Sequence, residues 1–207
     1  SEAVERLERF EHRHFWRSPM LTLQMPALPD PVKVVLQPAT TALLVFDMID
    51  RICKTQPNCT GVMVPALASL LVRARKAGVF VLYSTREPES SNWMPEVAPA
   101  SGDPVVKSVG QDRFYSTDLD KMLKAKGITT LILTGWKVSG SVVYTSVGAT
   151  LRGYTVVVPT DASLAATDYE VAIGQFQILN QNSANATNEP LKANASTLSR
   201  ADMIVFQ

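Results

Sequence analysis

Three side chains, far apart in the chain, have types and positions suited to acid–base or nucleophilic chemistry. Asp47 ends a continuous apolar run, Lys107 follows a short apolar run, and Ser141 lies just after the turn that begins at Gly135. A partly desolvated carboxyl group can act as a general acid or base, and a lysine can stabilise developing negative charge. A serine in the first turn of a helix lies near unpaired backbone N–H groups, which favour an anion.

Each of these residues also has an ordinary structural interpretation. Asp47 could be an edge acid or a helix N-cap, and Lys107 could be a solvated surface charge. Ser141, or Ser139 beside it, could simply cap the helix that follows. The residue types alone leave both interpretations open.

The elements that must position these residues follow from hydrophobic periodicity. We expect strands at 41–47, 79–84, 104–106, 128–134, 154–158 and 203–206, with a further short strand at 33–36 in the N-terminal segment, and helices at 1–16, 62–76, 116–126, 141–152 and 168–179. Strands that alternate with helices predict parallel β-α-β units with helices on both faces of the sheet. The predicted fold class is therefore α/β: a three-layer Rossmann-like fold with a mostly parallel six-stranded sheet flanked by helices.

In such a fold the ligand crevice lies beyond the carboxyl ends of the strands. This rule brings Asp47, Arg86, Lys107 and Ser141 to one edge of the sheet. The segment 85–110 is long for a connection in a compact domain, which favours a functional loop. We expect one domain over 1–207, with an N-terminal helical and extended arm at 1–39.

Composition limits the partners that we expect. The chain has 207 residues, 46% hydrophobic and 19% charged, with a formal net charge of +1. A dedicated nucleic-acid or membrane-surface partner normally requires a concentrated positive excess, so we predict no nucleic acid and no membrane as partners.

The two cysteines, Cys53 and Cys59, allow three interpretations. They could form a short-loop disulfide, which would indicate an oxidising compartment such as the periplasm or the outside of the cell. They could be two unrelated thiols. They could bind a metal, although neither a histidine nor a further cysteine lies nearby in the sequence.

Four segments, in their order and spacing, resemble the isochorismatase-like, or cysteine hydrolase, superfamily. They are Ala42–Met48; Lys107 with Phe114, Thr117 and Leu119; Leu131–Gly135; and Tyr154–Asp161. The resemblance covers about 40–179 and implies an Asp-Lys-Cys triad, in which Asp47 and Lys107 match the first two members. It also implies a cytoplasmic location and a homo-oligomer, a dimer or tetramer. We expect no cofactor and no metal, because the Asp-x-His of nicotinamidase-type members is missing.

Ser141 stands where the resemblance places the nucleophilic cysteine. An introduced Cys-to-Ser replacement, a natural member that hydrolyses without a covalent intermediate, and a loss of catalysis are the three explanations. Ile49, Val138 and Gly140 also depart from the common pattern, which favours a naturally cysteine-less site. A serine hydroxyl needs a positioned base that a thiolate does not.

The resemblance therefore implies a hydrolase acting on a C–N amide or ureide bond, or on a vinyl ether, of a small molecule. Asp47 would be the general acid or base, Lys107 its electrostatic partner, and Ser141 would occupy the nucleophile position. The alternative is a catalytically silent member that binds a small molecule. The candidate substrate-binding residues are Trp136, Lys137, Gly140, Phe114, Trp93 and Arg86.

Overall fold

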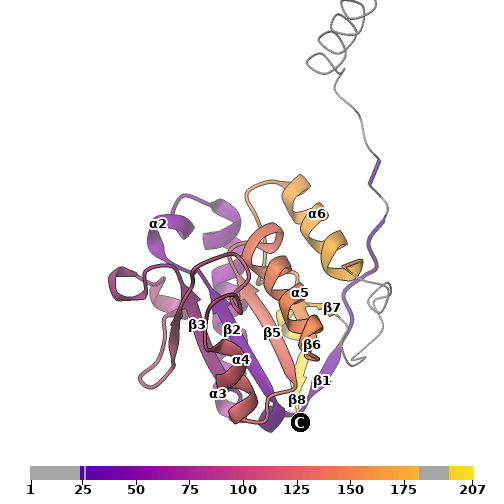
Figure 1. The fold of residues 1–207 in the computed structure, drawn as a ribbon. Helices are drawn as coiled ribbons and strands as arrows, with labels where there is room; N and C mark the ends of the chain where they lie inside the picture. The colour runs from indigo at the N-terminus through magenta and orange to yellow at the C-terminus, as the bar shows by residue number, and fades with distance from the viewer. Residues whose placement is uncertain (1–23, 26, 182–195) are drawn as a thin grey trace, which may run out of the picture.

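The computed structural model describes residues 24–25, 27–181 and 196–207 (Figure 1). The helix predicted for 1–16 and most of the Asn-rich stretch that follows residue 180 lie outside the described residues. Among the helices that are described, none is long and apolar enough to cross a membrane.

The centre of the molecule is a six-stranded, fully parallel sheet with strand order β4-β3-β2-β5-β6-β7. The strands are β2 (Thr41–Phe46), β3 (Phe80–Thr85), β4 (Val105–Lys107), β5 (Thr130–Gly135), β6 (Thr155–Pro159) and β7 (Ser196–Ser199). Every residue of β2 is buried, as expected for a central strand covered on both faces. The predicted six-stranded parallel sheet is confirmed.

Helices cover both faces of the sheet, so that alternate residues of each strand enter two separate cores. On one face, α3 (Val64–Ala77) packs with the small parallel pair β1 (Val34–Leu36) and β8 (Ile204–Phe206). On the other face lie α4 (Leu119–Ala125), α5 (Val143–Leu151) and α6 (Asp168–Leu179). In β2, Leu43 and Val45 face the first core, whereas Ala42, Leu44 and Phe46 face the second.

Short elements complete the chain. They are α2 (Asp50–Cys53), the π-helical turns η2 (Cys59–Met63) and η5 (Val138–Val142), and the 3-10 turns η1 (Pro38–Thr40), η3 (Pro88–Ser90), η4 (Pro95–Val97) and η7 (Ala201–Met203). The loop predicted after β3 therefore contains η3, η4 and the edge strand β4.

The strand at 203–206 does not close the main sheet, so this prediction is wrong. β8 pairs with β1 in a separate two-stranded sheet, and β7 forms the sixth strand beside β6. The sequence Ser-Thr-Leu-Ser of β7 carries little apolar signal. Its hydroxyl groups are bonded inside the protein: Ser196 joins Ser146 and Gln181, and the hydroxyl of Ser199 donates to the carbonyl of Val32.

The helix boundaries follow local signals. Helix α6 begins at Asp168 as predicted, but its N-cap is Thr167, whose hydroxyl accepts the Glu170 N–H at 3.2 Å. Gly78 ends α3 in the left-handed conformation, φ 81°, which glycine adopts at little cost.

Cys53 and Cys59 form a disulfide with a Cα–Cα distance of 5.2 Å. Among the three interpretations of the cysteines, the structure selects the disulfide. The bond closes a short loop directly after α2, at the carboxyl end of β2.

Candidate active site

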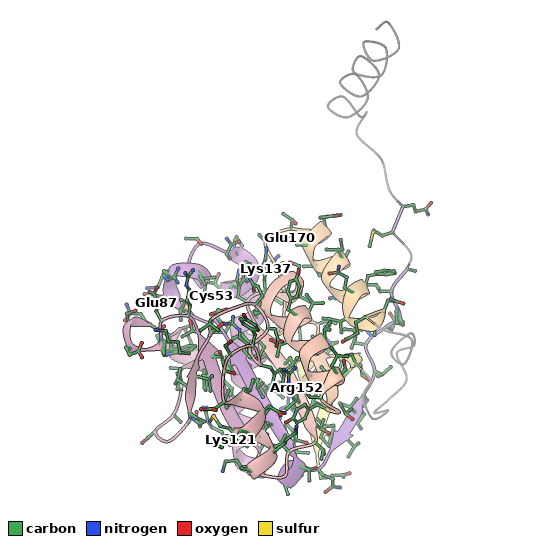
Figure 2. The ribbon with its side chains drawn as sticks, viewed as in Figure 1. Cys53, Glu87, Lys121, Lys137, Arg152 and Glu170 are labelled. Carbon is green, nitrogen blue, oxygen red and sulfur yellow. A yellow bond between two sulfur atoms is a disulfide. The ribbon has the colours of Figure 1, made fainter. Side chains whose placement is uncertain are left out.

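The parallel register brings the predicted residues to one edge of the sheet. Phe46 pairs with Ser84 of β3 and with Gly135 of β5, and Thr85 pairs with Lys107 of β4. Asp47 and the start of the Gly135 turn therefore extend from neighbouring strand ends. Figure 2 shows Cys53, Glu87, Lys137 and Glu170 at this carboxyl edge, and Lys121 at the opposite end of the molecule.

Asp47 has an unusual backbone conformation at the end of β2. Its φ is 52°, in the left-handed region that residues other than glycine seldom occupy. Its N–H donates to the Ser84 carbonyl at 3.2 Å, and its own carbonyl accepts the Ile49 N–H at 2.8 Å. Conformations of this kind persist where their surroundings hold them, and they cluster at functional sites.

The Asp47 side chain is 17% exposed and forms an ion pair with Arg113. Burial raises the pKa of the Asp47 carboxyl above its ordinary value, and three groups oppose this rise: the Arg113 guanidinium, the Thr85 hydroxyl and the Arg51 guanidinium. Burial outweighs the three, so the Asp47 pKa stays raised. A raised pKa makes the carboxylate a stronger base and moves its titration toward neutral pH, which suits a general acid or base.

Arg113 is held almost entirely inside the protein, with its side chain 5% exposed. Its guanidinium carbon lies 5.3 Å from the centre of the Phe46 ring, and its backbone N–H donates to the Thr145 hydroxyl at 3.1 Å. Burial lowers the pKa of Arg113, and Asp47 opposes that effect. The arginine is therefore the cation in direct contact with Asp47.

Asp47 lies in the wall of a cavity of about 360 Å³. The cavity is lined by Asp47, Arg51, Ile52, Arg86, Ser108, Val109, Gly110, Gln111 and Arg113. These residues come from the segments that follow β2, β3 and β4. The position agrees with the rule that open α/β sheets bind ligands beyond the carboxyl ends of their strands.

Lys107 lies at the same edge but does not contact Asp47. It ends β4, two strands from β2, which corresponds to about 10 Å between strands. Its side chain is exposed and forms no ion pair within the described ranges. Its register partner Thr85 hydrogen-bonds to Asp47, so the lysine is connected to the carboxyl group only through that neighbour.

Ser141 is 1% exposed and does not line the cavity. Its hydroxyl donates to the carbonyl of Trp136 at 2.8 Å, and no hydrogen bond joins it to Asp47 or Lys107. The turn is anchored to β2, because the Trp136 N–H donates to the Phe46 carbonyl at 2.9 Å. The peptide bond between Trp136 and Lys137 is cis.

Of the predicted substrate-binding residues, Arg86 lines the cavity and the other five lie elsewhere. Lys137 is ion-paired with Glu170 of α6. Trp93 packs edge-to-face on Tyr83, Phe114 stacks on Tyr154, and Trp136 packs against the core around α3. Gly140 lies close to one lining residue, because a Cβ atom there would be 3.3 Å from Oε1 of Gln111.

Sequence reasoning did not name four residues of the cavity that carry polar side chains: Arg51, Ser108, Gln111 and Arg113. Arg51 had a signal, since it lies four residues after Asp47. Arg113 and Gln111 had none, because only the folding of the segment after β4 brings them to Asp47. In the described part of the chain, no group of three or more His, Cys, Asp or Glu side chains is placed to hold a metal ion.

The parallel sheet, flanked by helices on both faces and carrying a partly buried acid at its carboxyl edge, defines a three-layer Rossmann-like α/β fold with a candidate site at the strand ends. The isochorismatase domain family matches residues 41–188, and the chain belongs to this family.

Two curated relatives are similar to this chain. Ureidoacrylate amidohydrolase RutB of Methylobacterium radiotolerans is 29% identical over an alignment of 160 residues, with coverage of 54% of this chain and 61% of the relative. Streptothricin hydrolase of Streptomyces noursei is 30% identical over 152 residues, covering 67% of this chain and 59% of that enzyme. The chain thus spans about three-fifths of the length of these relatives.

Solved structures of low identity share the fold. An isochorismatase family protein from Burkholderia thailandensis has a TM-score of 0.68 at 22% identity, covering 83% of this chain and 96% of its own. N-carbamoylsarcosine amidase from Thermoplasma acidophilum has a TM-score of 0.63 at 23% identity, covering 79% and 97%.

Proposed function

We propose that the chain is a hydrolase for a small molecule, with Asp47 as the general acid or base. One observation carries the proposal: a carboxyl group with a raised pKa lies in the wall of a cavity of about 360 Å³ at the carboxyl edge of the sheet. The size is in the range of small-molecule sites. The bond would be a C–N amide or ureide bond, as the names of the relatives suggest, or a vinyl ether.

The proposed reaction has no covalent enzyme intermediate. The Ser141 hydroxyl donates to a backbone carbonyl and has no base beside it, so it lacks the activation that an alcohol nucleophile requires. In this scheme Asp47 exchanges a proton with the substrate or with an attacking water. Arg113 holds the carboxyl group in place and sets its charge, and Lys107 adds a more distant positive charge at the same edge.

A panel of small amides, ureides and isochorismate tests the proposal, with Asp47→Asn as the key variant. The variant keeps the side-chain shape but cannot transfer the proton. Turnover should fall by about 10²- to 10⁴-fold, the usual contribution of a general acid or base. Asp202→Asn is the control, because Asp202 is 71% exposed and does not line the cavity. Equal turnover in both variants would sink the proposal.

The pH profile of kcat/KM separates the two roles of Asp47. A general acid must be protonated, so the rate falls as pH rises through its pKa; a general base gives the opposite slope. Because Arg113 opposes the rise of the Asp47 pKa, Arg113→Gln should move this limb to higher pH in either case. An unmoved limb would show that another group titrates.

A second candidate function, binding without turnover, is favoured by one specific observation. The residues at the three triad positions are not joined: Asp47 is paired with Arg113, and Ser141 is bonded to its own turn. For this candidate, calorimetry would detect binding of a panel member while the wild-type protein shows no product.

A further inference from the structure

The cavity beside Asp47 has a strong excess of positive charge. Three guanidinium groups line it, from Arg51, Arg86 and Arg113, and Asp47 supplies the one carboxylate among the lining residues. This leaves an excess of two positive charges in a chain whose formal net charge is +1. The charge of the whole chain is thus not spread evenly, and the excess is concentrated where a ligand would bind.

The three arginines differ in burial and in whether they form an ion pair within the protein. Arg113 is buried and donates to Asp47. Arg51 and Arg86 are both exposed, and neither forms an ion pair in the part of the chain that the structure describes. Their two guanidinium groups therefore retain hydrogen-bond donors for a ligand.

The nearby acids do not neutralise these two arginines. Asp50 and Glu87 line a smaller neighbouring cavity that also borders Arg51. Asp50 is paired with Lys54 at 3.3 Å, and Glu87 lies beyond ion-pair distance of either arginine. Apart from Asp47, which lies in the same cavity wall and interacts electrostatically with Arg51, the two arginines have no acidic partner among the described residues.

Arg51 and Arg86 also have the positions needed to bind a single ligand between them. Arg51 lies in α2 just after β2, with the Cys53–Cys59 disulfide directly behind it, and Arg86 directly follows β3. β2 and β3 are neighbours in the sheet, so Arg51 follows the same strand end as Asp47 and Arg86 follows the adjacent one. A guanidinium group binds carboxylate and phosphate oxygens through two parallel hydrogen bonds.

We propose that Arg51 and Arg86 form a clamp for a small dianion, so that the ligand of this site carries two negative charges, as a dicarboxylate or a phosphate does. This inference rests on the proposed function for its reaction, but binding alone can test it. Arg113 takes no part in the clamp while Asp47 occupies it. The cavity volume of about 360 Å³ limits the dianion to the size of a metabolite.

A charge series of constant shape provides the test. Isothermal titration calorimetry at pH 7.5 and low salt would compare fumarate, its monoamide and its diamide, with inorganic phosphate as a separate arm. Fumarate should bind roughly tenfold more tightly than the monoamide, since a charge-assisted hydrogen-bonded pair contributes about that factor. The relative affinities of fumarate and phosphate identify the source of the dianion. Equal affinity across the charge series, with no binding of phosphate, would overturn the clamp.

Variants assign the effect to the two arginines. Arg51→Gln and Arg86→Gln should each weaken binding of the preferred dianion by roughly tenfold. Lys121→Gln is the matched control, because it removes one positive charge at the opposite end of the molecule, as Figure 2 shows, and should leave affinity unchanged. If the arginine variants behave like Lys121→Gln, the clamp is refuted.

Asp47→Asn separates this inference from the proposed function. It removes the carboxylate from the cavity wall and releases Arg113, so dianion affinity should rise several-fold even as turnover falls. Tight dianion binding by a wild-type protein that shows no turnover would refute the proposed hydrolase activity and support the clamp. Turnover of a neutral amide, with no preference for charge, would keep the hydrolase and remove the clamp.

Discussion

Two turns at the carboxyl edge of the sheet differ in nearly every physical respect. The segment after β2 presents Asp47, in a left-handed conformation, to a cavity lined with arginines. The turn after β5 places Ser141 inside the protein, with its hydroxyl bonded to Trp136. In the family resemblance both turns should supply catalytic groups. Here the polar, accessible chemistry is concentrated on the Asp47 side, and the Ser141 side is packed like a core.

Packing around the Ser141 turn reinforces this contrast. A Cβ atom at Gly174 of α6 would lie 2.9 Å from the backbone of Val138 and Ser139, so helix and turn are in close contact. On the Asp47 side, the lining residues Arg51, Arg86 and Gln111 are exposed. One edge of the sheet can therefore hold a reactive half, around Asp47, and a structural half, around Ser141. Four sets of substitutions test this division.

Removing the Arg113 guanidinium should cause the largest loss of stability. Arg113→Gln leaves the partly buried Asp47 carboxylate without its direct ion-pair partner. Breaking a buried pair on one side costs 3–5 kcal/mol, and the 17% exposure of Asp47 places the loss near the lower limit, about 3 kcal/mol at pH 7. Urea unfolding measures the loss. It should shrink as pH falls, because the folded variant then takes up a proton on Asp47.

The control for Arg113→Gln is Arg51→Gln, which removes an exposed arginine from the same cavity. This change should alter stability by less than about 0.5 kcal/mol. Similar losses in the two variants would mean that the Asp47–Arg113 pair is not the ionic support of this half of the site.

Removing the disulfide on the Asp47 side should cause the second-largest loss of stability. Cys53→Ala with Cys59→Ala opens a loop with a sequence separation of 6, and the chain-entropy relation gives a loss of about 2 kcal/mol. Reducing the disulfide of the wild-type protein should cause a similar loss of unfolding free energy, measured as a lower urea midpoint. An unchanged midpoint in both experiments would show that the residues after Asp47 are held by packing alone.

Ser141→Ala should have a smaller effect, and it tests the other half of the comparison. The change removes the hydrogen bond to the Trp136 carbonyl and should cost about 1 kcal/mol. Turnover should stay within about threefold of the wild type, whereas Asp47→Asn loses about 10²-fold or more. Ser90→Ala, an exposed serine, is the stability control. A large loss of turnover in Ser141→Ala would show that the serine takes part in the reaction.

These contrasts explain which parts of the site the sequence could predict. The apolar run of β2 places Asp47 at a strand end, and the alternation of elements places Lys107 and Ser141 at the same edge. The direction in which a side chain points could not be predicted from the sequence. Ser141 points to its own turn, and Arg113 reaches Asp47 only because the segment after β4 folds over the sheet.

The same limit applies to the fold. Periodicity found α3, because this helix buries one apolar face. It missed β7, whose serine hydroxyl groups are satisfied by residues distant in the sequence. Tertiary hydrogen bonds of this kind leave no local pattern.

The smallest expected effect comes from the ion pair that fastens the Ser141 turn to α6. The hydrogen bond from Lys137 lowers the pKa of Glu170 below its ordinary value. A carboxyl whose pKa is lowered on folding stabilises the protein above its unfolded pKa, and this contribution disappears as pH falls through the folded value. Glu170→Gln should therefore cost roughly 0.5 kcal/mol at pH 7, since partly exposed surface pairs contribute little, and the cost should shrink as pH falls through the lowered pKa of Glu170.

Glu89→Gln is the matched control, because Glu89 is an exposed glutamate of η3 that forms no ion pair in the described part of the chain. Urea midpoints at pH 7 and pH 3 for both variants and the wild type decide the point. A loss at pH 7 much above 1 kcal/mol would show that the Lys137–Glu170 pair holds the turn more firmly than its packing does. The Ser141 half would then depend on charge as the Asp47 half does, and the contrast between the two halves would fail.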